Sequence, residues 1–148
     1  MMRLSTKGRY GARVMLELAL NYGNGPVLLK DIAKHQGISV GYLEHILPRL
    51  KAAGLVNSTR GAHGGYTLAK EPSRINLGQV VKALEGNLAI VECVTAPQVC
   101  QRVESCITRD IWGQMSRELM KMLGSTTLQD MVNRQKKKQE SSPLMYSI

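Results

Sequence analysis

Residues 29–50, LKDIAKHQGISVGYLEHILPRL, predict two short helices joined by a tight turn. The first helix covers Leu29 to His35, which is long enough for two turns, and residues 36–38 then turn the chain. Ser39 is a good N-cap for the second helix, because its hydroxyl can accept a hydrogen bond from a backbone N–H of the first turn. The second helix has apolar residues at the spacing of one buried face: Leu43, Ile46, Leu47 and Leu50. Together they form a helix-turn-helix pattern.

The flanking segments extend this motif into a winged helix-turn-helix. Upstream, Ser5 caps a predicted helix that the sequence Gly-Asn-Gly-Pro at 23–26 ends. Downstream, residues 55–60 and 66–68 predict two strands that pair around a glycine-rich turn. Two strands are too few for an independent sheet, so we expect this hairpin to lean on the helices as a wing. Asn76 then caps another amphipathic helix.

Residues 105–124 predict one long amphipathic helix that follows an irregular stretch. Its apolar stripe consists of Ile107, Ile111, Met115, Leu119, Met122 and Leu123. The stripe could pack on the winged part of its own chain, but no second long helix is predicted to cover it. We therefore expect the same helix of a second subunit to do so. Thr126 and Gln129 predict a capping box for a short final helix that ends near Asn133.

The predicted fold is mainly α: a winged helix-turn-helix with a two-stranded β wing, plus a long C-terminal dimerisation helix. We divide the chain into four parts. They are a winged helix-turn-helix DNA-binding domain at 1–85, a cysteine-bearing loop at 86–104, the dimerisation helix and short final helix at 105–134, and a flexible tail at 135–148.

Composition and charge narrow the class of function. The chain of 148 residues carries 20 basic and 11 acidic residues, a net charge of +9. Residues 1–85 hold 12 of the basic and 5 of the acidic residues, so most of the excess lies in the winged part, which favours a nucleic-acid partner. No apolar run approaches the roughly 18 to 20 residues that span a bilayer, and the basic N-terminus has no apolar signal core. We expect a cytoplasmic protein without a membrane partner.

Catalysis is not expected from this sequence. It contains no glycine-rich phosphate loop, no histidine pair at metal-ligand spacing and no recognisable nucleophile motif. The prediction is therefore that the protein is not an enzyme.

The second helix of a helix-turn-helix motif reads bases with its first turn. Here that turn offers Ser39, Tyr42 and His45 as donors to phosphates or bases, and Glu44 as an acceptor from cytosine N4. A carboxylate repels phosphates, so Glu44 either discriminates between sequences or is an ordinary solvated residue.

Arginine and lysine residues supply the remaining candidates for DNA contacts. Arg60 precedes the glycine-rich hairpin tip and is suited to the minor groove, although the glycines could also simply make a turn. Candidates for phosphate contacts, or else solvated charges, are Arg9, Arg13, Lys30 and Arg49.

Three cysteines, Cys93, Cys100 and Cys106, lie between the winged part and the long helix. They are separated by six and five residues, whereas zinc sites use tighter paired spacings, so structural zinc fits poorly. Three thiolates on an irregular loop suit an iron–sulphur cluster, and the alternatives are buried small hydrophobes or a thiol switch.

Several short segments, taken in order, resemble the Rrf-type winged-helix transcription regulators, a family that includes IscR-, NsrR- and CymR-type members. They are RLSTKGRY at 3–10, GIS at 37–39, YLE at 42–44, GLV at 54–56 and RGAHGGY at 60–66. The resemblance covers about residues 2–134. It implies a homodimer that binds double-stranded promoter DNA at a roughly palindromic site, with Tyr42, Glu44 and Arg60 at DNA-contact positions.

The same resemblance implies that Cys93, Cys100 and Cys106 are cluster ligands, as in the IscR and NsrR types. The cluster could be of the 2Fe–2S or the 4Fe–4S type. Arg109 stands where the IscR pattern has a ligating histidine, and Arg9 stands where NsrR-type proteins have a carboxylate. Candidates for a fourth ligand are Glu92, Glu104, Asp110 and His63, besides water, a small thiol or a residue of the partner subunit.

A cluster-free regulator is the alternative reading. The segments at 4–11 and 60–66 are also close to CymR-type members, which lack the cysteine trio and act through a partner protein. In that case a regulatory protein partner or thiol oxidation would control a regulator of cysteine or redox metabolism.

Overall fold

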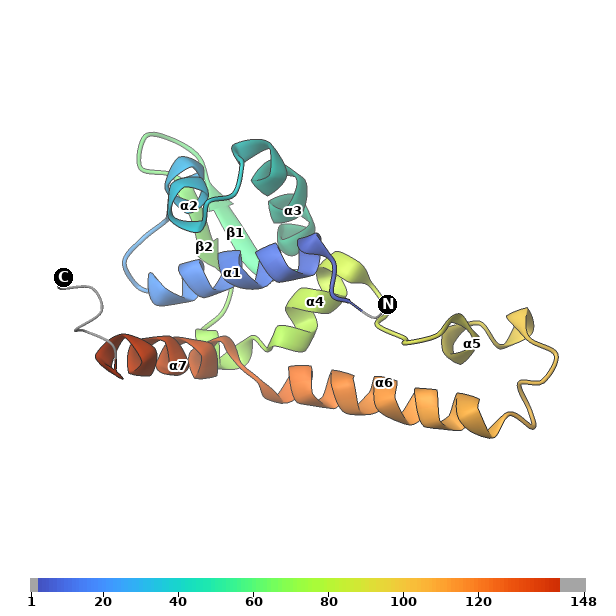
Figure 1. Ribbon diagram of the computed structural model, residues 1–148. Coiled ribbons are helices and arrows are strands. Elements are labelled where there is room, and N and C mark those ends of the chain that lie inside the picture. Colours follow the sequence, from blue (N-terminus) through green and yellow to red (C-terminus); the bar gives the residue numbers. More distant parts are fainter. Residues whose placement is uncertain (1–2, 142–148) are drawn as a thin grey trace.

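Helices dominate the computed structural model, which describes residues 3–141 (Figure 1). Within these residues the elements in chain order are α1 (Thr6–Leu20), α2 (Leu29–Gln36), α3 (Val40–Ala52), β1 (Val56–Thr59), β2 (Gly65–Leu68), the 3-10 turn η1 (Pro72–Arg74), α4 (Leu77–Glu85), α5 (Glu92–Thr95), the 3-10 turn η2 (Pro97–Val99), α6 (Ile107–Ser125) and α7 (Leu128–Ser141). The mainly α fold with a two-stranded wing is the predicted one.

Three of the predicted helices begin at the polar N-cap residues that the sequence indicates. The Ser5 hydroxyl accepts from the backbone N–H of Gly8, and Ser39 does the same for Tyr42 at the start of α3. Asn76 forms a capping box with Gln79, in which each side chain accepts from the other residue's backbone N–H at 2.9 Å. Local hydrogen bonding thus fixes where α1, α3 and α4 start.

The hairpin leans on the rest of the winged head, the name used here for residues 3–85. Strands β1 and β2 are antiparallel, and Val56 pairs with Leu68. Val27, in the loop before α2, exchanges two backbone hydrogen bonds with Tyr66 of β2, at 2.8 and 2.9 Å. Gly65 allows this close approach, since a Cβ there would lie 2.3 Å from the Val27 carbonyl oxygen.

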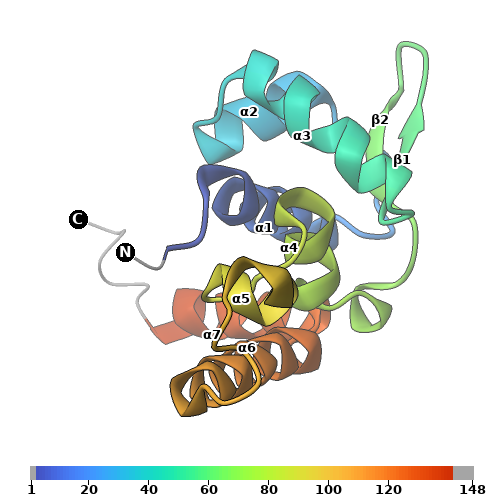
Figure 2. The same cartoon turned by 90° about the vertical axis from the view of Figure 1, so that its right-hand side faces the viewer.

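The core of the winged head lies where α1, α3 and α4 meet. The largest fully buried side chains come from almost every element of the head and from α7: Met15, Leu18, Ile32, Leu43, Ile46, Leu47, Leu50, Leu55, Ile75 and Leu128. Helix α1 packs closely on α4, because a Cβ at Gly11 would come within 2.0 Å of a Leu84 methyl carbon. Figure 2 shows the helix-turn-helix and wing at one end, with α1 and α4 between them and helices α6 and α7.

Helix α6 mostly buries a face other than its apolar stripe. Gly113, Ser116 and Leu123 are its buried residues. Only Leu123 belongs to the predicted stripe, and the rest of that stripe is exposed. The sequence therefore predicts the helix, but apart from Leu123 the face that α6 buries is not the apolar stripe.

Helix α7 differs from the prediction at both ends. The capping box is formed by Thr127 and Asp130, one residue beyond the predicted pair, because the Thr126 hydroxyl instead donates to the carbonyl of Met122. The helix continues to Ser141 rather than ending near Asn133, so residues 135–141 are helical and not a tail. The remainder of the predicted tail, 142–148, lies outside the described residues.

None of the helices in the described part of the chain is both long and apolar enough to span a membrane.

Candidate nucleic-acid interface and cysteine segment

The first turn of α3 presents the predicted base-reading side chains on the surface of the winged head. Ser39, Glu44 and His45 are exposed, and Tyr42 is half-buried. Ser39 caps the helix, since its hydroxyl oxygen accepts from the Tyr42 N–H at 3.1 Å, and its own O–H stays available as a donor. The helix start and its polar side chains therefore lie where a partner can reach them.

Tyr42 is held by aromatic contacts that the sequence did not reveal. Its ring packs edge-to-face against Tyr10 of α1, with ring centroids 5.5 Å apart, and lies 6.2 Å from the His45 ring. The Arg13 guanidinium lies over the Tyr10 ring, 5.3 Å from its centroid. The sequence signals for this cluster are the i, i+3 spacings of Tyr10 with Arg13 and of Tyr42 with His45.

Arg60 lies on the hairpin turn of the wing and is exposed. The turn is tight: the Gly64 N–H donates to the Gly61 carbonyl at 3.0 Å, and a Cβ at Gly64 would meet the Thr59 carbonyl oxygen at 2.1 Å. Lys51, at the end of α3, donates to the Ser58 hydroxyl of β1 at 2.7 Å and ties the wing to that helix. The hairpin thus offers a narrow, cationic tip next to α3.

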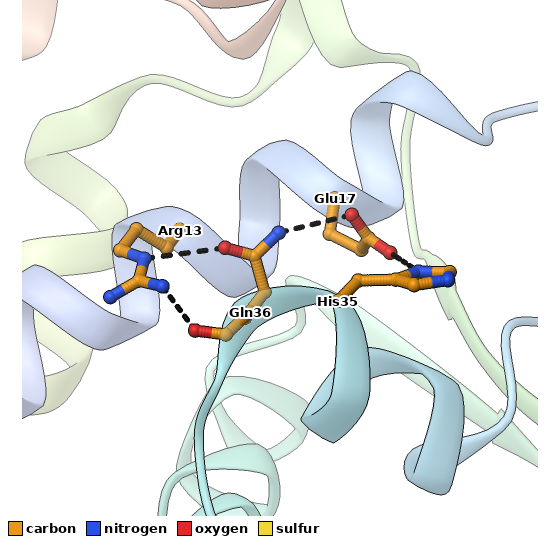
Figure 3. Close-up of polar contacts among 4 residues, drawn as sticks. All are labelled: Arg13, Glu17, His35 and Gln36. Carbon is orange, nitrogen blue, oxygen red and sulfur yellow. Dashed lines mark hydrogen bonds and ion pairs between the residues drawn. The ribbon is translucent and has the colours of Figure 1, made fainter.

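The predicted phosphate contacts have different surroundings. Arg9, Lys30 and Arg49 are exposed, and Arg9 donates to the Thr6 hydroxyl at 3.2 Å on its own helix. Arg13 is also exposed, and it donates hydrogen bonds to Gln36 at the end of α2 (Figure 3). From α2 to β2, residues 29–68, the chain carries five basic and two acidic residues, so this surface has a net charge of +3.

The cysteine segment, defined here as residues 86–106, carries all three cysteines, and none of them forms a disulfide. Cys93 lies in α5 and is half-buried, Cys100 follows η2 and is exposed, and Cys106 is the half-buried N-cap of α6. Within residues 3–141, the structure does not bring three His, Cys, Asp or Glu side chains together as a metal-holding group. The donor chemistry fits an iron–sulphur cluster, because three thiols share one short segment, but the segment is not arranged around a common centre.

Arg109 connects the first and third cysteines. Its Nε donates to the Cys93 carbonyl oxygen at 3.1 Å, and its backbone N–H faces the Cys106 thiol. The Thr108 hydroxyl lies 3.2 Å from the Cys106 sulphur. Hydrogen bonds from Thr108 and from the Arg109 backbone lower the pKa of the Cys106 thiol, which makes it a better metal ligand.

The candidates for a fourth ligand are scattered. Glu92 adjoins Cys93 in sequence, and both Glu104 and Asp110 are exposed near Cys106. His63 is on the wing turn, which lies at the opposite end of the molecule from α5 and α6 (Figures 1 and 2). The structure therefore separates His63 from the cysteines of the same chain.

An apolar groove of about 960 Å³ runs along α6. Leu4 and the loop residues Leu88 and Ile90 line one side, and the stripe of α6 lines the other with Ile111, Met115 and Leu119. The Ile90 N–H donates to the Ser116 hydroxyl at 3.1 Å and holds the loop beside the helix. Large apolar side chains remain exposed along α6, from 72% for Ile107 to 37% for Trp112. Monomeric proteins rarely expose so continuous an apolar face.

Comparison with known proteins gives one consistent result. Residues 4–134 match the model of the Rrf2 family, described as an iron-dependent transcriptional regulator. The chain is 45% identical to the protein rrf2 of Nitratidesulfovibrio vulgaris over 131 residues, which are 88% of this chain and 87% of that protein. It is 42% identical to the HTH-type transcriptional regulator IscR of Klebsiella pneumoniae over 134 residues, which are 90% of this chain and 82% of that one.

The fold has a close match among solved structures. CymR (YrzC), the global cysteine regulator of B. subtilis, superimposes with a TM-score of 0.79 and 40% identity, covering 90% of this chain and 98% of the other. IscR is a transcriptional regulator by name and CymR a global cysteine regulator, so the proteins that this chain is similar to are regulators and not enzymes.

Proposed function

Because the chain belongs to the Rrf2 family of transcriptional regulators, we propose that it binds double-stranded promoter DNA as a cytoplasmic homodimer under the control of an iron–sulphur cluster. The observation that carries the DNA-binding role is the exposed, cationic surface formed by α3 and the wing. Ser39, Tyr42, Glu44 and His45 read bases in the major groove from the first turn of α3. Arg60 enters the minor groove from the narrow wing tip.

The phosphate contacts are supplied by three exposed cations around this surface. Arg9 and Lys30 come from α1 and α2, which precede the recognition helix, and Arg49 lies in the last turn of that helix, α3. Such contacts position a protein on the duplex without reading its sequence, and they make affinity depend on salt. Glu44 has the opposite effect on affinity, since its carboxylate repels phosphates and gains a hydrogen bond only from a base that can donate to it.

Dimerisation is supported by the apolar stripe of α6. The buried residues of α6 are Gly113, Ser116 and Leu123, so all of the stripe except Leu123 stays exposed. A second copy of α6 offers a matching apolar surface, and closed twofold symmetry is the commonest way to bury one. Two heads joined by this helix would address two half-sites of a palindromic promoter.

Cluster control is supported by the donor set and by its place in the chain. Cys93, Cys100 and Cys106 are the proposed ligands of a 2Fe–2S or 4Fe–4S cluster, with the fourth ligand from Glu92, Glu104, Asp110 or outside the chain. A bound cluster supplies a centre that responds to iron, oxygen or nitric oxide. The segment joins α4 of the head to α6, so a change in its order alters how the two heads are spaced on DNA.

Anaerobic reconstitution tests cluster control. The wild-type protein is expected to take up iron and sulphide and to turn brown, with visible absorbance. Replacing any one cysteine with alanine should abolish or greatly weaken assembly, while circular dichroism shows that the winged head keeps its fold. A wild-type protein without iron, sulphide and visible absorbance would overturn the cluster. Identical DNA binding by the cluster-loaded and cluster-free proteins would leave the ligands standing but overturn the control of DNA binding.

A cluster-free regulator of cysteine or redox metabolism is the second candidate, favoured by the similarity to the CymR structure. In this reading a partner protein or oxidation of a thiol sets the state of the regulator. The lowered pKa of Cys106 suits it for oxidation. A colourless protein whose DNA binding changes with peroxide, and not with iron and sulphide, would establish this reading over the cluster.

A further inference from the structure

We propose that Arg13, Glu17 and Gln36 form a positioning latch that holds the turn between α2 and α3 and thereby sets the angle at which α3 meets DNA. This inference rests on the proposed role of α3 as the recognition helix. It also gives a positioning role to Arg13, for which the sequence predicts either a phosphate contact or a solvated charge.

The latch joins α1 to the last residue of α2 (Figure 3). Arg13 of α1 donates from Nε to the Gln36 side-chain oxygen at 3.2 Å and from a terminal nitrogen to the Gln36 backbone carbonyl. The Gln36 amide nitrogen then donates to Glu17 at 3.0 Å. His35 completes the group through a 2.5 Å contact between its Nδ1 and the other Glu17 oxygen.

The end of α2 needs such a partner. The last carbonyls of a helix have no acceptor role inside it, and a cation near them is favourable. Gln36 is followed by Gly37 in the left-handed conformation, with φ at 63°, so the chain leaves the helix at this residue. Arg13 therefore satisfies an unpaired carbonyl at the residue where the turn begins.

Arg13 also supports the start of α3 from its other side. Its guanidinium lies over Tyr10, which packs edge-to-face against Tyr42 in the first turn of α3. One side chain thus contacts the residue before the turn by hydrogen bonds and, through Tyr10, the residues after it. Because these contacts hold both the turn before α3 and the first turn of α3, the helix can keep a fixed angle to the rest of the winged head.

The geometry distinguishes a positioning residue from a phosphate contact. Arg13 is exposed, but two of its five N–H donors and one face of its guanidinium are engaged by Gln36 and Tyr10, which fixes the side chain against the head. Gln36 is oriented by a cation on its oxygen and an anion on its nitrogen. An amide is the side chain that satisfies both neighbours at once.

The test compares Arg13→Gln with Lys30→Gln, which removes a proposed true phosphate contact. Binding is titrated over a range of salt concentrations. The probes are a duplex that the wild-type protein selects from a random-sequence pool and a scrambled duplex of the same composition. Loss of the charge-assisted bonds of Arg13 should weaken the selected duplex about tenfold, with little change for the scrambled one and an unchanged salt slope. Lys30→Gln should weaken both duplexes alike and reduce the salt slope by about one.

An exchange of side chains provides the second, independent readout. Gln36→Glu sets two carboxylates against each other and should lower the preference for the selected duplex. Adding Glu17→Gln to this variant again pairs one amide with one carboxylate, now with their positions exchanged. The preference for the selected duplex should therefore recover. Thermal unfolding by circular dichroism verifies that each variant is folded at the temperature of the titration.

Three results would overturn the latch. They are an Arg13→Gln variant that behaves like Lys30→Gln, an unchanged preference in Arg13→Gln, and a Gln36→Glu defect that Glu17→Gln does not repair. A wild-type protein that selects no duplex at all would instead overturn the DNA-binding role itself. That outcome is recognised from the wild type alone, before any variant is compared.

Discussion

The winged head and the cysteine segment bury their side chains to very different degrees. The head contains most of the core, with Leu43, Ile46 and Leu47 completely buried, whereas no residue in 86–106 is buried. Among residues 3–141, every buried side-chain nitrogen or oxygen has a hydrogen-bond partner. The head, together with Leu128 and Val132 of α7, therefore has a closed apolar core, and the cysteine segment has none.

The difference indicates where regulation can act. A packed core has one arrangement and resists change, while a segment with few buried contacts changes its order at low cost. The apolar stripe of α6 follows this segment in the chain, and most of its side chains are also exposed within one subunit. The proposed DNA-reading surface lies on the tightly packed part of the chain, and the proposed sensing segment lies on the part with few buried contacts.

Truncating a core residue should have the largest effect on stability. Leu47→Ala removes a fully buried side chain and should lower the free energy of unfolding by about 3 kcal/mol. Val99→Ala, in the cysteine segment, shortens a side chain that is 50% exposed and should cost less than about 0.5 kcal/mol. Urea unfolding of the cluster-free protein, followed by circular dichroism, measures both. Equal losses would mean that the segment belongs to the same packed unit as the head.

A charge on the stripe of α6 should act on assembly and leave the fold of the head intact. Met115→Glu would bury a carboxylate in the proposed dimer interface, which raises the dissociation constant of the dimer by at least about 30-fold. Arg117→Gln, on another face of α6, is the matched control and should leave the dimer unchanged. Sedimentation equilibrium gives the constants. A wild-type protein that is monomeric at micromolar concentration would contradict the dimer itself.

The head was predictable from sequence because its signals are local. Ser5, Ser39 and Asn76 are each followed by a helix with regular apolar spacing, and each caps that helix in the structure. The cap of α7 was misplaced by one residue because two adjacent threonines each have an acceptor three positions on. Only the tertiary position of Thr126, which is buried against α6, leaves Thr127 as the cap.

The end of α7 and the role of Arg13 were missed for different reasons. Apolar periodicity in α7 stops at Val132, but the glutamines and lysines that follow favour a helix, and no glycine or proline interrupts it before Ser141. Arg13 reaches Gln36, 23 positions along the chain, and only the packing of α1 on α2 brings them together. Spacing rules describe neighbours on one element and carry no information on such contacts.

Surface changes on the head should alter DNA binding without altering stability. Arg60→Ala removes a minor-groove cation and should weaken binding to the selected duplex about tenfold, a loss typical of one specific contact. Glu44→Ala should mainly relax discrimination at one base pair, and binding to a scrambled duplex should stay equal or rise. Titrations at matched salt test both variants, and unchanged affinity and specificity in both would rule out this face.

The smallest expected effect is on the pKa of the Cys106 thiol in the cysteine segment. The Thr108 hydroxyl and the Arg109 backbone N–H stabilise its thiolate, so its pKa is lower than that of an ordinary thiol. Alkylation by iodoacetamide requires the thiolate, and the midpoint of its rate against pH should therefore lie below the ordinary thiol range. In a cluster-free variant with Cys93→Ala and Cys100→Ala, Cys106 is the one thiol left to be alkylated.

Adding Thr108→Val removes the largest stabilising hydrogen bond and should move this midpoint to higher pH, because the thiolate loses a donor while the thiol loses little. Thr95→Val, which changes a hydroxyl that bonds within α5, is the control and should leave the midpoint in place. If both threonine variants leave the midpoint where it was, the segment does not hold Thr108 against Cys106 in solution. The contrast with the head would then be sharper still, since even this local contact would be absent from the cluster-free state.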